Sequence, residues 1–170
     1  RLSDIKILFR TTASQMPIER SFRRHGIAYR VVESTSSTME GVCYDLYSFL
    51  QLLVYPDDRL SYIALLRSPY ARLSDQAILE AASAEGDAFS SMPSFSSPAD
   101  EKSYLGLRGI YLEARSMVSR KPLSELLDYI FYQGGYYGFL SSQESLIPYM
   151  DHYEYLWTLA SGFDRKGKGI

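Results

Sequence analysis

The spacing of hydrophobic positions changes once along this chain, near residue 38. Before that point, apolar side chains form two short runs, residues 5–9 and 27–32, with a helical pattern between them. Short apolar runs are typical of buried strands, and Gly26 stands where a helix would end. The pattern predicts a βαβ unit whose parallel strands pair with further strands.

After residue 38 the apolar positions recur every three to four residues, which indicates helices. We therefore expect a mainly α fold with a small βαβ portion and at least five helices. The stripes predict helices over residues 42–53, 60–66, 98–119, 123–131 and 148–160, and one that starts after Ser74.

Polar residues mark several of the expected boundaries. Ser74 is suited to cap a helix, with Leu73 and Ile78 placed as a hydrophobic staple. Between the helices lies a serine-rich stretch, residues 86–98, in which five of the eight residues from Ser90 to Ser97 are serine. This composition favours a flexible loop that contributes nothing to the core.

The composition of the chain limits the class of protein to which it can belong. The chain has 170 residues, 46% of them hydrophobic and 22% charged, which is typical of one soluble globular domain with or without an appendage. No apolar run reaches the roughly 18 residues that span a bilayer, and no secretory signal is present. Cys43 is the one cysteine, so a reducing cytoplasm is expected. Because the chain enters a strand-like run directly from Arg1, we expect a piece of a longer protein.

Charge is unevenly distributed, although the net charge is -2. Residues 1–30 carry seven basic side chains against Asp4 and Glu19, whereas residues 31–101 carry eleven acidic side chains against three arginines. A basic end can attract a polyanion, because local potential steers a charged ligand more than net charge does. A solvated helix face explains the same pattern without any ligand.

The sequence contains no recognisable catalytic constellation. It has no GxxxxGK[ST] phosphate loop, and its two histidines, His25 and His152, lack metal-binding spacing. Cys43 lies on an apolar helix stripe, which favours a buried, inert thiol. Fifteen tyrosines mostly follow helical stripes, so core packing is their expected role.

Several short motifs occur in order along the chain. The first 33 residues end their first strand-like run in Arg10-Thr11-Thr12 and reach Tyr29-Arg30-Val31 after the helix. Further motifs are LRSPY at 66–70, LSD at 73–75 and PLSELL at 122–127. This order resembles superfamily 1 DNA helicases of the UvrD/RecB type, and it is most similar to the AddA/RecB branch of helicase-nuclease subunits.

The resemblance implies a domain organisation. Residues 1–33 would be a βαβ fragment of the second RecA-like motor domain, and residues 34–170 would be the helical insertion called 2B. ATP and magnesium would then bind in the parent protein, outside this chain, because motor chemistry needs a cleft between two domains. We expect the isolated chain to have no cofactor and no enzymatic activity, and its parent to be an ATP-dependent helicase or exonuclease (a hydrolase).

The resemblance also implies DNA-binding residues. Arg10 and Thr12 match the family's "RTN" contacts to single-stranded DNA, although Thr12 replaces the amide. The family's duplex-gripping "GIG" turn matches Arg72-Leu73-Ser74, where both glycines are lost. Arg30 would complete a basic stripe with Arg10 and Arg72.

Two functions remain open from the sequence. One is a non-catalytic, DNA-facing fragment of a helicase-exonuclease that processes double-strand ends in DNA repair and recombination. The other is a helical module whose tyrosine-rich surface docks a companion subunit. A basic stripe on one surface would favour DNA, and an exposed tyrosine patch would favour the partner. No membrane is expected in either case.

Overall fold

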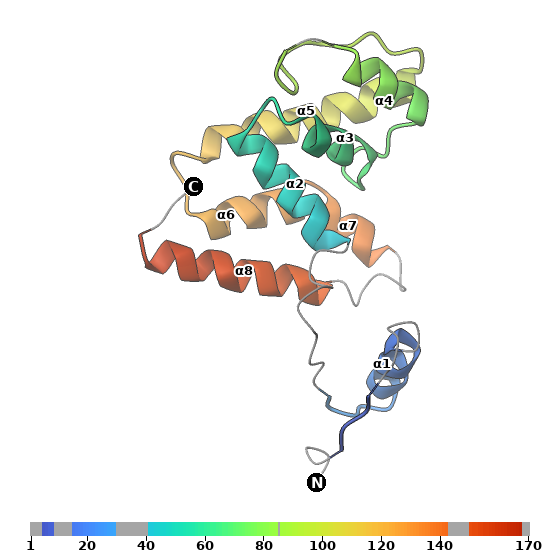
Figure 1. The fold of residues 1–170 in the computed structure, drawn as a ribbon, viewed down its shortest axis with the longest axis vertical. Helices are drawn as coiled ribbons and strands as arrows, with labels where there is room; N and C mark the ends of the chain where they lie inside the picture. Colours follow the sequence, from blue (N-terminus) through green and yellow to red (C-terminus); the bar gives the residue numbers. More distant parts are fainter. Residues whose placement is uncertain (1–4, 9–14, 30–40, 85, 143–149, 168–170) are drawn as a thin grey trace. The chain divides into compact units, whose positions relative to one another are not determined.

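A computed structural model describes residues 5–8, 15–29, 41–84, 86–142 and 150–167. The chain divides into two compact units, Arg1–Ser37 and Thr38–Ile170. Figure 1 shows the elements of each unit, coloured along the sequence. The assignment of residues 1–33 to a motor domain and of 34–170 to an insertion stays a prediction.

The first unit contains one described helix, α1 (Gln15–Arg24). It ends as the sequence indicates: Gly26 has a φ of 63°, and the Ile27 amide donates to the Phe22 carbonyl at 2.9 Å. The left-handed conformation at Gly26 is one that glycine adopts without steric cost. The rings of Phe22 and Tyr29 then pack with centroids 5.5 Å apart across this turn.

The βαβ portion is not supported by the structure. Residues 5–8 and 27–29, the described parts of the two expected strands, form no strand. The side chains of Ile5 and Leu8 are 67% and 91% exposed. A strand is stabilised by neighbouring strands, and the part of the chain that the structure describes offers none to these runs.

The second unit is helical, as the apolar stripes predict, and the mainly α fold is confirmed. Its first described helix, α2, packs against α3, α5 and α8 (Figure 1). A single π-helical turn, η3, continues α6. The described elements are α2 (Val42–Val54), α3 (Arg59–Arg67), α4 (Asp75–Ala82), α5 (Pro98–Met117), α6 (Leu123–Asp128), η3 (Tyr129–Gln133), α7 (Tyr136–Ser141) and α8 (Met150–Arg165).

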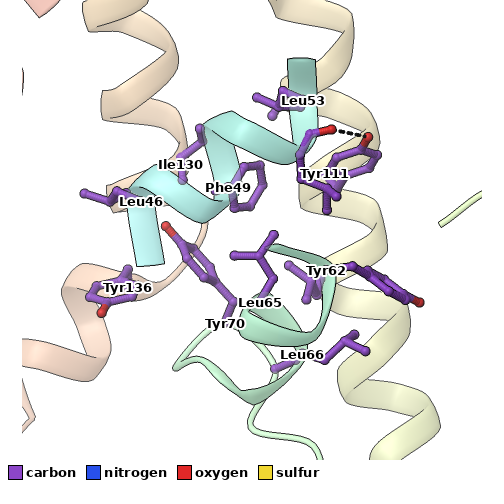
Figure 2. Packing of buried hydrophobic residues seen from close by; sticks show 14 of the residues in the cluster. Leu46, Phe49, Leu53, Tyr62, Leu65, Leu66, Tyr70, Tyr111, Ile130 and Tyr136 are labelled. Atoms are coloured by element: carbon purple, nitrogen blue, oxygen red, sulfur yellow. Dashed lines mark hydrogen bonds between the residues drawn. The ribbon is translucent and has the colours of Figure 1, made fainter. Parts of the chain in front are cut away.

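The core is built on the buried face of α2. Leu46, Phe49 and Leu52 are fully buried, and Figure 2 shows α3 and Tyr111 of α5 beside this helix. Phe49 lies edge-on to Tyr70, with ring centroids 5.3 Å apart. The Tyr111 hydroxyl donates to the Leu52 carbonyl at 3.2 Å, so this tyrosine packs in the core without leaving its polar atom unpaired.

The prediction for the serine-rich stretch is wrong. Phe89, just before the run of serines, is 2% exposed and stacks among three core tyrosines. Its ring lies 5.1 Å from Tyr62, 5.5 Å from Tyr104 and 4.8 Å from Tyr111. Pro93 is buried as well. The stretch therefore contributes to the core. Burial of the large Phe89 ring stabilises the fold even though most of the neighbouring residues are polar.

The helical segment formed by α6 and η3 ends at Gly134 and Gly135. A Cβ atom at Gly134 would lie 2.1 Å from the Ile130 carbonyl oxygen and 2.9 Å from Tyr70 Cε1. The Gly134 amide instead donates to the Tyr129 carbonyl at 3.0 Å, which closes η3. Gly135 has a φ of 80° and starts α7, a short helix that the sequence analysis did not anticipate.

Candidate nucleic-acid interface

Of the four residues proposed from the sequence to contact DNA, the structure describes one. Arg10, Thr12 and Arg30 lie outside the described residues, so their grouping with Arg72 stays a prediction. Arg72 lies in the turn between α3 and α4, and its side chain is exposed.

The backbone of Arg72 adopts the conformation that glycine favours. Its φ is 51°, and its amide donates to the Ser68 carbonyl at 2.9 Å. A residue with a Cβ atom in this left-handed conformation costs roughly 1–2 kcal/mol. The turn therefore combines a backbone that favours glycine with an exposed guanidinium group. That group lies 5.5 Å from the centre of the Phe139 ring on α7.

Hydrogen bonds hold this turn firmly against the end of α3. The Ser68 hydroxyl donates to the Leu65 carbonyl at 2.7 Å, and the Leu73 amide donates to the Leu66 carbonyl at 3.0 Å. Leu73 is buried, and Ile78 is buried one turn later, as the predicted staple requires. Arg72 thus projects from a rigid support, which lowers the entropic cost of binding a ligand.

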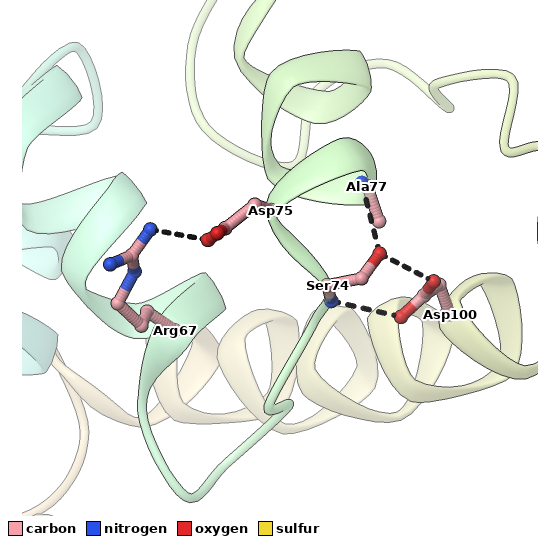
Figure 3. Close-up of polar contacts among 5 residues, drawn as sticks. All are labelled: Arg67, Ser74, Asp75, Ala77 and Asp100. Atoms are coloured by element: carbon pink, nitrogen blue, oxygen red, sulfur yellow. Dashed lines mark hydrogen bonds and ion pairs between the residues drawn. The ribbon is translucent and has the colours of Figure 1, made fainter.

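The start of α4 is occupied by a carboxylate from α5. The Ser74 hydroxyl accepts from the Ala77 amide at 3.2 Å, which confirms the predicted cap (Figure 3). The same hydroxyl donates to Asp100 at 2.8 Å, and the Ser74 amide donates to Asp100 at 3.1 Å. The backbone and hydroxyl hydrogen bonds from Ser74 lower the pKa of Asp100. Anions favour helix N-termini, and here an internal aspartate fills that place.

Charges around the turn balance. Arg67 and Asp75 form an exposed ion pair at 2.6 Å, drawn in Figure 3. Together with Arg72 and Asp100, they bring two positive and two negative charges to the turn. Among the described residues, Arg72 is therefore not part of a broad basic surface. The sequence analysis missed Asp100, because its position in the first turn of α5 gives no indication of its partner in α4.

The charge gradient predicted from the sequence follows the two units. The unit Arg1–Ser37 holds seven basic and three acidic residues, a net charge of +4. The unit Thr38–Ile170 holds eleven basic and seventeen acidic residues, a net charge of -6. The helical unit as a whole therefore repels a nucleic acid, and any contact to phosphate must come from local groups of cations.

A second polar cluster lies where α2 meets α7. The Tyr136 hydroxyl donates to the Asp45 carboxylate at 2.5 Å. Burial raises the pKa of Asp45, although this hydrogen bond opposes the shift. The Tyr70 hydroxyl nearby is buried and has no hydrogen-bond partner among the described residues, and burial raises its pKa too. These groups form a core network, with no exposed nucleophile or base.

Thiol and imidazole groups meet at the start of α8. The Cys43 sulfur lies 3.9 Å from His152 Nδ1, a contact between residues 109 positions apart that the sequence could not indicate. Cys43 is 2% exposed, in agreement with the predicted buried thiol. Within the described part of the chain, no group of three or more His, Cys, Asp or Glu side chains is arranged to hold a metal ion. None of the described helices combines the length and the hydrophobicity that crossing a membrane requires.

Comparison with known proteins gives a limited match. No protein family matches the chain, and no solved structure does. ATP-dependent DNA helicase PcrA from Bacillus subtilis (strain 168) is 33% identical over 69 residues. The similarity is to a DNA helicase. The match covers 41% of this chain and 9% of PcrA, so it compares a short stretch of the two proteins.

Proposed function

We propose that this chain is a non-catalytic, DNA-facing part of an ATP-dependent DNA helicase. The observation that carries the proposal is the 69-residue similarity to PcrA. It is supported by the turn at Arg72, whose backbone has the left-handed conformation expected where the resembled helicases have glycine. A mainly helical unit that follows a smaller basic unit is compatible with a helical insertion in a motor domain.

The finer assignment follows from the motifs. In this proposal, residues 1–33 belong to the second motor domain and residues 34–170 to its 2B-like insertion. The resemblance of the LRSPY and PLSELL motifs to the AddA/RecB branch supports a parent of that branch, proposed as an exonuclease that processes double-strand ends in repair and recombination. A reducing cytoplasm is the proposed compartment, given the single cysteine.

Nucleotide chemistry is assigned to the parent protein. A triphosphate bound with magnesium needs a phosphate loop and carboxylates that hold the metal. The sequence has no GxxxxGK[ST] loop, and the described residues contain no suitable carboxylate group. The described residues therefore do not fit ATP or magnesium, and we assign this chain no step of hydrolysis.

DNA contact is proposed through a few cations. Arg10, Arg30 and Arg72 would neutralise phosphates, and Thr12 would donate a hydrogen bond to one. Each neutralised phosphate contributes roughly -0.7 to the slope of log K against log salt on single strands. With about three such contacts, we expect weak binding in the non-specific range of about 10⁻⁴–10⁻⁶ M near physiological salt.

A second candidate function rests on the outer face of α2. Tyr44, Tyr47 and Tyr55 are each about half exposed, as is Val54, and no charged residue interrupts this stripe. Tyrosine is enriched in protein interfaces because it buries much area at little entropic cost. The alternative is therefore a helical module that docks a companion subunit of a helicase-nuclease complex.

Fluorescence anisotropy with labelled single-stranded and junction oligonucleotides tests the two proposals. We expect micromolar or weaker binding that falls as salt rises, and Arg72→Ala should flatten the salt slope by less than about one unit. Tyr47→Ala, in the α2 stripe, is the matched control and should leave binding unchanged. Absence of binding at low salt would contradict the DNA-facing function and favour the docking module.

A further inference from the structure

We propose that the last turn of α8 and the adjoining turn between α5 and α6 form a binding surface for single-stranded DNA. This inference deepens the proposed function and rests on it for the identity of the ligand. Four exposed cations define the surface, which we call the α8 basic end: Arg120, Lys121, Arg165 and Lys166. None of them belongs to the contacts expected from the sequence.

A hydrogen-bonded link brings these cations together from distant parts of the chain. The amides of Leu123 and Ser124 donate to the Asp164 carboxylate at 2.8 and 3.0 Å. Lys121 precedes Leu123 by two residues, which limits their Cα separation to about 7 Å. Arg165 directly follows Asp164. The start of α6 and the end of α8 therefore lie side by side, as Figure 1 also shows.

The α8 basic end stays positive after its neighbours are counted. Its four cations face two carboxylates, Glu125 and Asp164. The C-termini of α5 and α8 each contribute roughly -0.5 charge and the N-terminus of α6 roughly +0.5, which leaves about +1.5. This local excess contrasts with the net charge of -6 of the unit that carries it.

Local structure accounts for only part of this charge. Arg120 donates to the Ser116 carbonyl at 2.8 Å, and Lys121 pairs with Glu125 at 2.8 Å. Among the described residues, no hydrogen bond or ion pair engages the side chains of Arg165 and Lys166. These two cations are thus available to a ligand without breaking an internal contact.

Exposed apolar side chains, two of them aromatic, extend the surface along α8. Tyr155, Leu159 and Phe163 are 54%, 44% and 48% exposed, and their spacing of four residues places them on one face. Lys166 lies in the turn that follows α8, and its amide donates to the Phe163 carbonyl at 3.0 Å. Proteins that bind single strands combine cations with aromatic platforms on which bases stack. Phe163 next to Lys166 provides this combination, and the similarity to a DNA helicase favours DNA over an acidic protein.

Anisotropy with a labelled oligothymidine and the full chain tests the surface. Reversing two charges, in R165E/K166E, should weaken binding at about 50 mM salt by about fivefold or more and flatten the salt slope by about 1.4 units. The matched control R59E/K102E makes the same change of net charge on exposed residues elsewhere, and should change affinity less than twofold. Phe163→Ala should weaken binding by about fivefold and leave the salt slope unchanged, because stacking involves no counterion release.

Each outcome supports or contradicts binding of single-stranded DNA at the α8 basic end. If R165E/K166E perturbs folding by circular dichroism, R165Q/K166Q replaces it and should flatten the salt slope by the same amount, about 1.4 units, because both phosphate contacts are lost. Binding within twofold of the unmodified chain in these variants overturns the inference; if Arg72→Ala still weakens binding, the proposed function survives. No binding by the unmodified chain refutes both. An acidic peptide that binds this surface while oligothymidine does not would assign it to a protein partner and overturn the inference.

Discussion

At the scale of single residues, two residues other than glycine have the left-handed backbone conformation that glycine favours. Arg72 and Phe89 have φ values of 51° and 59°. A residue keeps such a strained backbone conformation where the surrounding contacts hold it in place. Phe89 is held by three core tyrosines, whereas Arg72 is held by its backbone hydrogen bond to Ser68. Burial of its ring therefore explains the positive φ of Phe89. Burial does not explain the positive φ of Arg72, so we infer that its exposed guanidinium has a function.

Substitution of Phe89 measures how much the serine-rich loop contributes to stability. Phe89→Ala should lower the free energy of unfolding by about 3–5 kcal/mol, because it leaves a cavity among the tyrosines. Met92→Ala, at a 46% exposed position of the same loop, should change it by less than about 0.5 kcal/mol. Urea denaturation followed by circular dichroism gives both values. A loss below about 1 kcal/mol for Phe89→Ala would mean that the loop is not part of the cooperative core.

Substitutions of Arg72 separate backbone strain from charge. Arg72→Gly should be more stable than Arg72→Ala by about 1 kcal/mol, since glycine adopts a positive φ without steric cost. Both variants remove the guanidinium and its stacking on Phe139, so they should lose DNA affinity equally. Urea denaturation and anisotropy measure the two effects. Equal stability of the variants would show that the turn relaxes away from φ 51° when arginine is removed.

At the scale of elements, the sequence predicts what depends on nearby residues. The apolar stripes locate α2, α5 and α8, and Ser74 caps α4 as expected. These signals lie within a few residues of the structure that they specify. The two predicted strands do not form. A strand depends on partner strands, and residues 5–8 and 27–29 have none within the described chain.

Tertiary polar links are the part of the candidate sites that the sequence could not supply. Asp100 reaches Ser74 across 26 residues, and Asp164 reaches Leu123 across 41. Within its own segment of sequence, each aspartate cannot be distinguished from an ordinary residue near the end of a helix. Their partners depend on how the helices pack, and a single sequence does not encode this in any local pattern.

The contact between α2 and α7 should make stability depend on pH. Burial raises the pKa of Asp45, so the folded chain binds a proton that the unfolded chain has released. This contribution to stability is present below the unfolded pKa of about 4 and is lost as pH rises through the folded pKa. Asp45→Asn keeps an oxygen for the Tyr136 hydroxyl without a buried charge. It should unfold with less pH dependence and be at least as stable at neutral pH.

Thermal unfolding between about pH 4 and pH 7 checks this expectation. Glu101→Gln, at an exposed position of α5, is the control and should retain the pH dependence of the unmodified chain. A larger loss of stability in Asp45→Asn than in Glu101→Gln at neutral pH would show that the ionised carboxylate stabilises the contact.

At the scale of the whole molecule, stability and positive charge are carried by different units. The clustered core residues all lie between Val42 and Ala160, within the helical unit. The basic excess lies in Arg1–Ser37, which carries +4. If the proposed function is right, the helical unit supplies a rigid support and a few directed contacts, while the basic unit supplies long-range attraction to phosphate.

Removal of residues 1–37 tests this division directly. The remaining chain keeps the entire core cluster, so it should unfold cooperatively within a few degrees of the full chain. Its affinity for oligothymidine should fall about tenfold, and its salt slope should flatten by about 1.4 units if Arg10 and Arg30 each neutralise one phosphate. The binding that remains should depend on Arg72 and the α8 basic end, so R165E/K166E in this shorter chain should weaken it further by about fivefold or more. Unchanged affinity after the deletion, measured by anisotropy alongside a thermal melt, would place DNA contact in the helical unit alone and remove the role proposed for Arg10 and Arg30.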